Sequence, residues 1–292
     1  RLTGKYYKYN SASFYLKGDD AEDFLNRFTT NNLNKLSYGQ YQYSILTDYN
    51  GHIIDLLLIF KLDEGLLIVG SHERFTDVTN HLDKYILSED VRIESAKFDK
   101  SIFLFNTPDN KDFNNIINNS FEMSEDIIIF KDALFNGHIH LIYFNPKDII
   151  EENAELMTFE EFEYFRITNL IPYSINELND RVIPLECNLN DFISFDKGCY
   201  LGQEVISRIY SQDKLPKRMF LFKSEYEILS GDKIFIKNLD DENFIECGFI
   251  SSAIKRYNEF YALGFIRTRN FNTNNIYYLI KENKFTELKL IK

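Results

Sequence analysis

The pattern of this chain changes at Pro216, and the change limits the folds that the chain can adopt. After Pro216, short strand-like runs follow one another, with turn signals such as Ser230-Gly231-Asp232 between them. Short strands at such even spacing predict a small antiparallel β-barrel. The predicted strands of this part are 219–223, 233–237, 246–251, 260–266 and 276–280.

The part before Pro216 alternates strand-like and helical runs, with no linker rich in Gly, Ser or Pro. Strands are predicted at 14–16, 42–46, 53–61, 66–70, 102–105, 127–130 and 138–144. Helices are predicted at 21–28, 74–85, 113–118 and 159–168. The sequence therefore predicts an α+β protein with two domains, namely 1–212, built from two interleaved subdomains, and 213–292, the barrel.

Composition excludes several classes of protein. A formal net charge of −12 argues against nucleic-acid binding, because neutralising phosphates requires a basic face. No apolar run approaches the length of a membrane span, so no membrane partner is expected. Three cysteines without close pairs argue against a disulfide framework and against a metal site, which favours the reducing cytoplasm.

The densest group of special residues is the run Lys197-Gly198-Cys199-Tyr200-Leu201-Gly202-Gln203-Glu204, with Arg208 four positions on. We expect a strand over 192–195, then a tight turn, then a helix with Gly202 in its first turn. Cys199 would lie near the helix N-terminus and Lys197, which both favour a thiolate. The alternative is an inert cysteine in an ordinary strand-to-helix turn. Glu204 and Arg208 are spaced to pair on one helix face.

Other polar residues are weaker candidates. Asp55 lies in an apolar strand-like run, where a buried carboxylate requires partners or a shifted pKa. It is a candidate to bind a ligand, and a purely structural hydrogen bond is an equal alternative. His138 and His140 face one side of a predicted strand, but without a third ligand nearby we predict no metal site.

The run from Lys197 to Glu204, with Arg208, resembles the signature of the YgfZ family. Those proteins are folate-binding relatives of the glycine cleavage T-protein and are linked to assembly and repair of iron–sulfur clusters. Further similar segments are Leu16 to Ala21, Leu46 to Asp55, Arg166-Ile167, Ile171-Pro172, Pro184 to Leu189, Cys247 to Ser252 and Ala262 to Phe265. The resemblance therefore spans most of the chain.

The resemblance implies a central cavity that holds tetrahydrofolate or a one-carbon derivative, with iron–sulfur client or assembly proteins as partners. The residues that it assigns to catalysis are Cys199 and Asp55. Those that it assigns to the cofactor are Lys197, Tyr200, Gln203, Glu204, Arg208, Glu186 and Asn188. The basic residues Lys214, Lys217 and Arg218 are candidates to receive the glutamate tail of a folate, with a solvated loop as the alternative.

Departures from the related T-protein pattern bear on the reaction. The region 135–140 lacks the Tyr-Thr-Gly-Glu stretch of T-proteins, and Asp55 is followed by Leu56 rather than by a second aspartate. Leu170 stands where the YgfZ family usually has Gly. Two hypotheses follow: a folate-binding accessory protein for iron–sulfur proteins, or an aminomethyltransferase that moves a one-carbon unit to tetrahydrofolate. A folate-binding scaffold without chemistry is a third.

Overall fold

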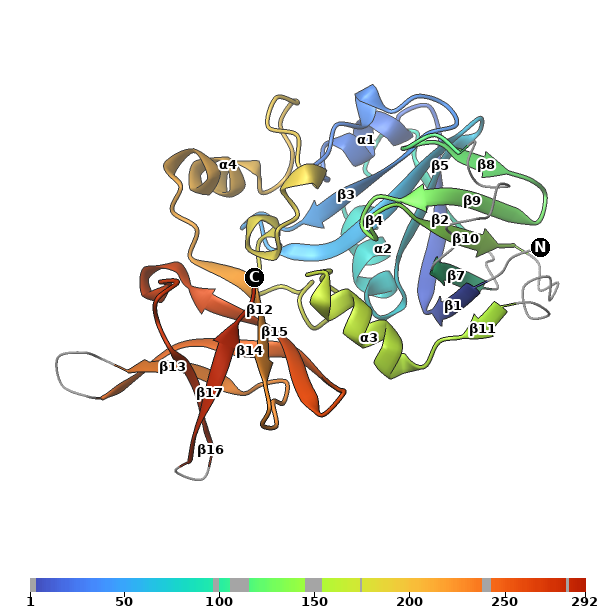
Figure 1. The fold of residues 1–292 in the computed structure, drawn as a ribbon. Coiled ribbons are helices and arrows are strands. Elements are labelled where there is room, and N and C mark those ends of the chain that lie inside the picture. Colours follow the sequence, from blue (N-terminus) through green and yellow to red (C-terminus); the bar gives the residue numbers. More distant parts are fainter. Residues whose placement is uncertain are drawn as a thin grey trace. The chain divides into compact units, whose positions relative to one another are not determined.

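The computed structural model describes residues 4–96, 100–105, 116–144, 154–173, 175–237, 243–281 and 284–292. It divides into two compact units (Figure 1). The first comprises Arg1–Met157, Asn179–Arg181 and Asn190–Val205, and the second comprises Thr158–Leu178, Val182–Leu189 and Ile206–Lys292. The division at residue 212 stays a prediction. Among the described residues, no helix is both long and apolar enough to cross a membrane.

Within the residues that the structure describes, the first unit contains two sheets. One has the strand order β3-β4-β5-β2-β6 and the other the order β11-β1-β7-β10-β9-β8. The strands of the first sheet are β2 (Ser11–Lys17), β3 (Tyr41–Thr47), β4 (Ile53–Leu62), β5 (Gly65–Ser71) and β6 (Arg92–Ser95). Those of the second are β1 (Gly4–Tyr9), β7 (Lys100–Phe105), β8 (Phe121–Met123), β9 (Ile127–Asp132), β10 (His138–Tyr143) and β11 (Ala154–Leu156).

Helices bury apolar side chains against the sheet that contains β3 and β4. They are α1 (Ala21–Asn26) and α2 (Phe75–Asp83), with short 3-10 helices η1 (Leu33–Lys35) and η2 (His72–Arg74) beside them. Phe24 and Leu25 of α1 and Leu82 of α2 have no exposed surface and share one core with Leu57 and Ile59 of β4. Fully burying such a side chain contributes about 1.5–3 kcal/mol, so this core holds β3, β4 and the turn between them.

Aromatic side chains join the two sheets. The ring of Phe130 on β9 lies 4.8 Å from that of Tyr41 on β3 and 5.1 Å from that of Phe60 on β4, measured between centroids. All three residues are buried. Such pairs add about 0.5–1.5 kcal/mol beyond the area that they bury, so many of the phenylalanines and tyrosines of the chain serve the core.

The second unit is built around the predicted barrel, which is closed in the order β12-β15-β14-β13-β16-β17 (Figure 1). Its strands are β12 (Lys217–Ser224), β13 (Lys233–Lys237), β14 (Phe244–Arg256), β15 (Glu259–Arg267), β16 (Tyr277–Lys281) and β17 (Lys284–Leu290), with η6 (Thr268–Asn270) before β16. The same unit contains α3 (Phe159–Thr168) and η4 (Pro184–Cys187). Two further elements flank the run from Lys197 to Glu204, namely η5 (Asn190–Phe192) and α4 (Gln203–Gln212). The α+β class and the C-terminal barrel are confirmed.

Two local predictions are wrong. Residues 192–195 do not form a strand, because η5 ends at Phe192 and an irregular segment follows it. The helix predicted at 113–118 lies partly outside the described residues, and its described part, 116–118, is not helical. The prediction over 159–168 matches α3, where Thr158 and Glu161 form a capping box.

Candidate functional site

Residues 192–202, called here the signature loop, are held against the segment 26–31 that follows α1. The Thr30 hydroxyl donates to the carbonyl of Phe192 (2.8 Å), and the N–H of Ser194 donates to the carbonyl of Thr30 (3.0 Å). At the other end of the loop, the N–H of Leu201 donates to the carbonyl of Arg27 (2.9 Å). These hydrogen bonds lie on both sides of Cys199 and fix the ends of the turn that carries it.

Lys197 makes the strongest attachment of the signature loop. Its ammonium donates to the carbonyl oxygens of Asn26 (2.6 Å), Thr29 (2.7 Å) and Asn31 (2.8 Å). The side chain is buried, which lowers the pKa of Lys197 to about 7, whereas the three acceptors favour its charged form. Lys197 therefore satisfies three backbone carbonyls, one at the last residue of α1 and two in the segment that follows this helix.

The two glycines of the signature loop have different environments. Gly202 has φ +85°, and a Cβ atom there would lie 2.5 Å from the carbonyl oxygen of Asp48 and 2.9 Å from the Cα of Gly51. The hydroxyl of Thr47 also donates to the carbonyl of Leu201 (2.7 Å). The β3–β4 turn and the signature loop thus meet backbone to backbone. At Gly198, by contrast, an added Cβ would have no neighbour within 4 Å.

Cys199 is exposed at the tip of this turn, whereas Cys187 and Cys247 are buried. Burial raises the pKa of Cys247 to about 12 and that of Cys187 well above its usual value. Those two thiols are inert by environment. Cys199 is therefore the accessible thiol among the three cysteines, and its predicted thiolate character stays a prediction.

The residues that follow Cys199 divide into buried and exposed ones. Tyr200 is buried, burial raises the pKa of its phenol, and the hydroxyl has no hydrogen-bond partner among the described residues. The side-chain oxygen of Gln203 accepts from the N–H of Tyr200 (3.2 Å) and so stabilises the turn before α4. Glu204 and Arg208 are exposed on α4, and no ion pair joins them in the described part of the chain.

Glu186 and Asn188 lie in the second unit, at η4. The Glu186 carboxylate is buried, accepts from the N–H of Ile183 (3.1 Å) and pairs with the ammonium of Lys217 (2.9 Å). Asn188 is exposed and ends η4 with φ +60°, a conformation that asparagine tolerates well. Of the basic residues considered for a folate tail, Lys217 thus has an internal partner, while Lys214 and Arg218 are exposed.

Asp55 on β4 has no exposed surface. One of its oxygens accepts from the N–H of Ser71 (2.8 Å) and the other from the Ser71 hydroxyl (2.7 Å). Burial raises the pKa of Asp55 to about 6, although the Ser71 hydrogen bonds oppose this shift. The structural alternative is therefore supported by two hydrogen bonds, and the raised pKa leaves an acid that titrates close to neutrality.

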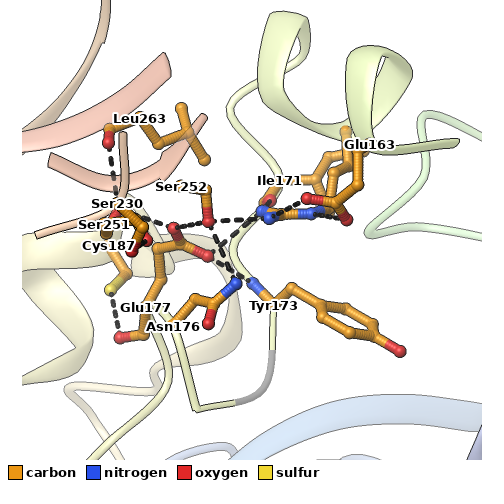
Figure 2. Close-up of polar contacts among 11 residues, drawn as sticks. Glu163, Ile171, Tyr173, Asn176, Glu177, Cys187, Ser230, Ser251, Ser252 and Leu263 are labelled. Atoms are coloured by element: carbon orange, nitrogen blue, oxygen red, sulfur yellow. Dashed lines mark hydrogen bonds and ion pairs between the residues drawn. The ribbon is translucent and has the colours of Figure 1, made fainter. Parts of the chain in front are cut away.

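The second unit contains a buried ionic network that sequence reasoning missed (Figure 2). The guanidinium of Arg166 donates to both oxygens of Glu163 (2.6 and 2.5 Å), to Glu177 (3.1 Å) and to the Ser252 hydroxyl (2.7 Å). Glu177 also accepts from the hydroxyls of Ser251 (2.6 Å) and Ser252 (2.7 Å). The network ties α3 and the segment 171–178 to β14. The spacing of Arg166 and Glu163 was the available signal.

A second group, of which sequence reasoning nominated only His140, lies in the first unit. The Tyr43 hydroxyl donates to the Asp132 carboxylate (2.9 Å), which contacts Nδ1 of His140 at 2.8 Å. All three side chains are buried, and His140 stacks on Phe130. His140 thus faces a carboxylate inside the core. The sequence signal was Asp132 at the end of the apolar run 127–132 and His140 within the apolar run 138–143.

Comparisons with known proteins agree with this architecture. Residues 10–127 match the GCVT N-terminal domain. The chain is 26% identical over 258 residues to an aminomethyltransferase of Aquifex aeolicus, covering 80% of this chain and 67% of the relative. It is 22% identical over 299 residues to the tRNA-modifying protein YgfZ of Buchnera aphidicola, covering 95% and 90%. A putative chloroplastic transferase of Arabidopsis thaliana is 25% identical over 226 residues, and the chain spans 52% of its length.

A solved structure shares the fold. The crystal structure of the glycine cleavage system aminomethyltransferase T from Bartonella henselae superposes with a TM-score of 0.85 at 14% identity, covering 99% of this chain and 85% of that one. The fold is therefore that of the GcvT-type proteins. Together with the domain match and the YgfZ relative, it confirms the resemblance to the YgfZ family within the GcvT-like superfamily.

Proposed function

We propose that this protein binds tetrahydrofolate or a one-carbon derivative and supports the assembly or repair of iron–sulfur clusters in the cytoplasm. The observation that carries the proposal is the way in which the fold presents Cys199. Hydrogen bonds from Ser194, Lys197 and Leu201 fix the signature loop on either side of the thiol, and yet the thiol is exposed. A fold that needed only a turn would not require a buried ammonium to hold it.

Two features of the signature loop fit a bound ligand. The buried hydroxyl of Tyr200 has no partner among the residues that the structure describes, and buried polar groups without partners are rare. A Cβ atom added at Gly198 would meet no atom of the described chain within 4 Å, so packing does not require a glycine there. A residue without Cβ lets a ligand approach the backbone closely. Tetrahydrofolate offers polar ring atoms to the hydroxyl and a flat face to the backbone.

The residues assigned to the cofactor divide into two roles under this proposal. Lys197 and Gln203 already have partners within the first unit, so they would position the loop that meets the folate. Glu204 is exposed in the same unit and would contact it directly, while the cofactor roles of Glu186, Asn188 and Arg208, which belong to the second unit, stay predictions. Tyr200 would contribute its hydroxyl, and Cys199 would perform redox, ligand or one-carbon chemistry at or near the folate.

The test separates folate recognition from thiol chemistry. The purified protein is titrated with tetrahydrofolate and its one-carbon derivatives, together with the Cys199→Ser variant. We expect both proteins to bind folate. In a host that lacks the gene, we expect the wild type to restore the activity of iron–sulfur enzymes and Cys199→Ala not to do so. Full restoration by Cys199→Ala would reject a role for the thiol, and absence of folate binding would reject the proposal.

The alternative is an aminomethyltransferase that moves a one-carbon unit from an amine donor to tetrahydrofolate. The fold match and the aminomethyltransferase relatives favour it, as does an Asp55 whose pKa is raised to about 6, close to the pH at which general acids work well. Turnover of an aminomethyl donor with tetrahydrofolate that is lost in Asp55→Asn would support this activity. Folate binding without any such turnover would exclude it and leave an accessory or scaffold role.

A further inference from the structure

A cavity of about 500 Å³ lies at the start of the signature loop, in the first unit. It is lined by Asn31, Asn32, Lys35, Gln42 and residues 193–196. Its volume falls in the range of about 300–1,000 Å³ that small-molecule sites occupy. Cys199 is not among the lining residues, so the cavity is a separate feature from the exposed thiol.

The cavity wall carries one positive and one negative charge. The ammonium of Lys35 lies 3.2 Å from the carboxylate of Asp196, which also accepts from the Ser194 hydroxyl at 2.8 Å. Hydrogen bonding from Ser194, followed by Lys35, lowers the pKa of Asp196, so the carboxylate is ionised at neutral pH. Both side chains of the pair are mostly exposed, and such pairs are weakly held. The pair can therefore separate around a ligand at little expense.

Carboxamides supply the other polar groups. The Asn31 side chain has partners of its own, because it donates to the carbonyl of Tyr43 and accepts from the N–H of Asn32. Gln42 differs, since its side-chain nitrogen is shut off from solvent and has no acceptor within the described chain. A half-turn of the carboxamide exchanges its nitrogen and oxygen, so Gln42 can offer either a donor or an acceptor to the cavity. Buried Ile193 provides an apolar wall.

We propose that this cavity binds a free α-amino acid in its zwitterionic form. The carboxylate of the ligand pairs with Lys35, its ammonium pairs with Asp196, and a small polar side chain bonds to Gln42. Opposite charges side by side, with no net charge, match a zwitterion better than an anion or a cation. The proposal is independent of folate binding, and either can fail without the other.

The cavity is mechanically linked to Cys199. Residues 194–196 immediately precede Lys197, and Asn31, which lines the cavity, gives its carbonyl to the Lys197 ammonium. A ligand that moves Asp196 shifts the residue next to Lys197, and a ligand that moves Asn31 shifts an acceptor of the Lys197 ammonium. Occupancy of the cavity is therefore expected to change the rate at which Cys199 reacts.

The experiment uses ¹⁵N-labelled full chain and follows the Gln42 side-chain amide by NMR during titration with glycine, L-serine and L-glutamine. Acetate, methylammonium and glycerol serve as control ligands. We expect a saturable shift with at least one amino acid, affinity reduced about tenfold or more in Lys35→Met and Asp196→Asn, and a changed labelling rate of Cys199. Lys84→Met, an exposed lysine outside the lining, is the matched control and should bind as the wild type does.

Three outcomes would overturn the proposal. The first is the absence of any amide shift at millimolar amino acid. The second is equal binding of acetate, methylammonium or glycerol, which would show that the paired charges do not select a zwitterion. The third is full displacement of the amino acid by tetrahydrofolate with shifts at the same residues, which would assign the cavity to the folate.

Discussion

The ammonium of Lys197 donates to the carbonyl oxygen of Thr29 across 2.7 Å, although 168 positions separate the two residues. Asn26 and Asn31 provide two further carbonyl acceptors on the same segment. Lys197 therefore fixes the loop that presents Cys199. The positions of the residues next to Lys197 in the sequence depend on these three hydrogen bonds.

Replacing Lys197 should destabilise the first unit. Lys197→Met leaves three carbonyls without their donor, and an unsatisfied buried group costs about 1–3 kcal/mol. We expect the midpoint of urea unfolding to fall and Cys199 to react with a chromogenic disulfide at a different rate. Lys84→Met, on an exposed lysine, should change neither. An unchanged midpoint in Lys197→Met would contradict the role of the three hydrogen bonds.

The two glycines of the signature should respond differently to alanine. Gly202→Ala brings a Cβ to 2.5 Å from the carbonyl of Asp48 at φ +85°, and strain of this kind costs about 1–3 kcal/mol. Gly198→Ala meets nothing within 4 Å, so its stability should be close to that of the wild type, whereas its affinity for folate should fall. Thermal unfolding and folate titration of the pair test this. Equal losses of stability in the two variants would refute a structural role for Gly202 that Gly198 does not share.

Asp55 should make stability depend on pH. Its folded pKa of about 6 lies above its ordinary value of 3.8, so the folded state binds this proton more tightly than the unfolded state does. The contribution of this proton to the free energy of unfolding is fully present below pH 3.8 and is lost as the pH rises through about 6. Asp55→Asn lacks this titration, so the difference in free energy of unfolding between the variant and the wild type should move in favour of the variant by up to about 3 kcal/mol as the pH rises between these limits. Urea unfolding curves at several pH values measure the difference, and parallel pH profiles would contradict it.

Arg166 should be among the residues least tolerant of change. Arg166→Met leaves Glu163 and Glu177 as buried carboxylates without their cation, and breaking such a pair costs about 3–5 kcal/mol. Arg218→Met, at an exposed arginine of the same unit, is the control and should cost less than about 0.5 kcal/mol. Thermal unfolding of both variants distinguishes them. A mild effect at Arg166 would mean that solvent replaces the lost charge.

Native thiol labelling should modify Cys199 alone, because Cys187 and Cys247 are buried. We expect one fast equivalent in the native wild type, none in Cys199→Ser, and reaction of the two buried thiols only after unfolding. Mass spectrometry of the labelled peptides identifies the site. Rapid native labelling of Cys187 or Cys247 would show that their surroundings open readily.

Local patterns predicted the elements whose signals are strong. The apolar run 53–61 became β4, and the capping residues of α3 set its start at Phe159. Strands β1 and β17 were missed because tyrosines and lysines dominate β1 and charged residues interrupt β17; both are stabilised by pairing with neighbouring strands. Leu170 adopts φ +57°, which explains a family preference for Gly without preventing the same backbone.

The candidate site was only partly accessible to sequence reasoning. Its residues could be nominated because unusual types crowd into the segment from Lys197 to Glu204. Their partners could not, because Lys197 contacts carbonyls about 170 positions away and carbonyls carry no residue-specific signal. For the same reason, the links from Arg166 to Ser252 and from Tyr43 to Asp132 emerge only in three dimensions.

The contact between Gly202 and the turn at Asp48 and Gly51 has an evolutionary corollary. Because main chain touches main chain there, no side-chain substitution can absorb a change in the length of that turn. An insertion in it would be transmitted directly to the segment that carries the thiol. Among homologues, the lengths of these two remote segments are therefore expected to vary together or not at all.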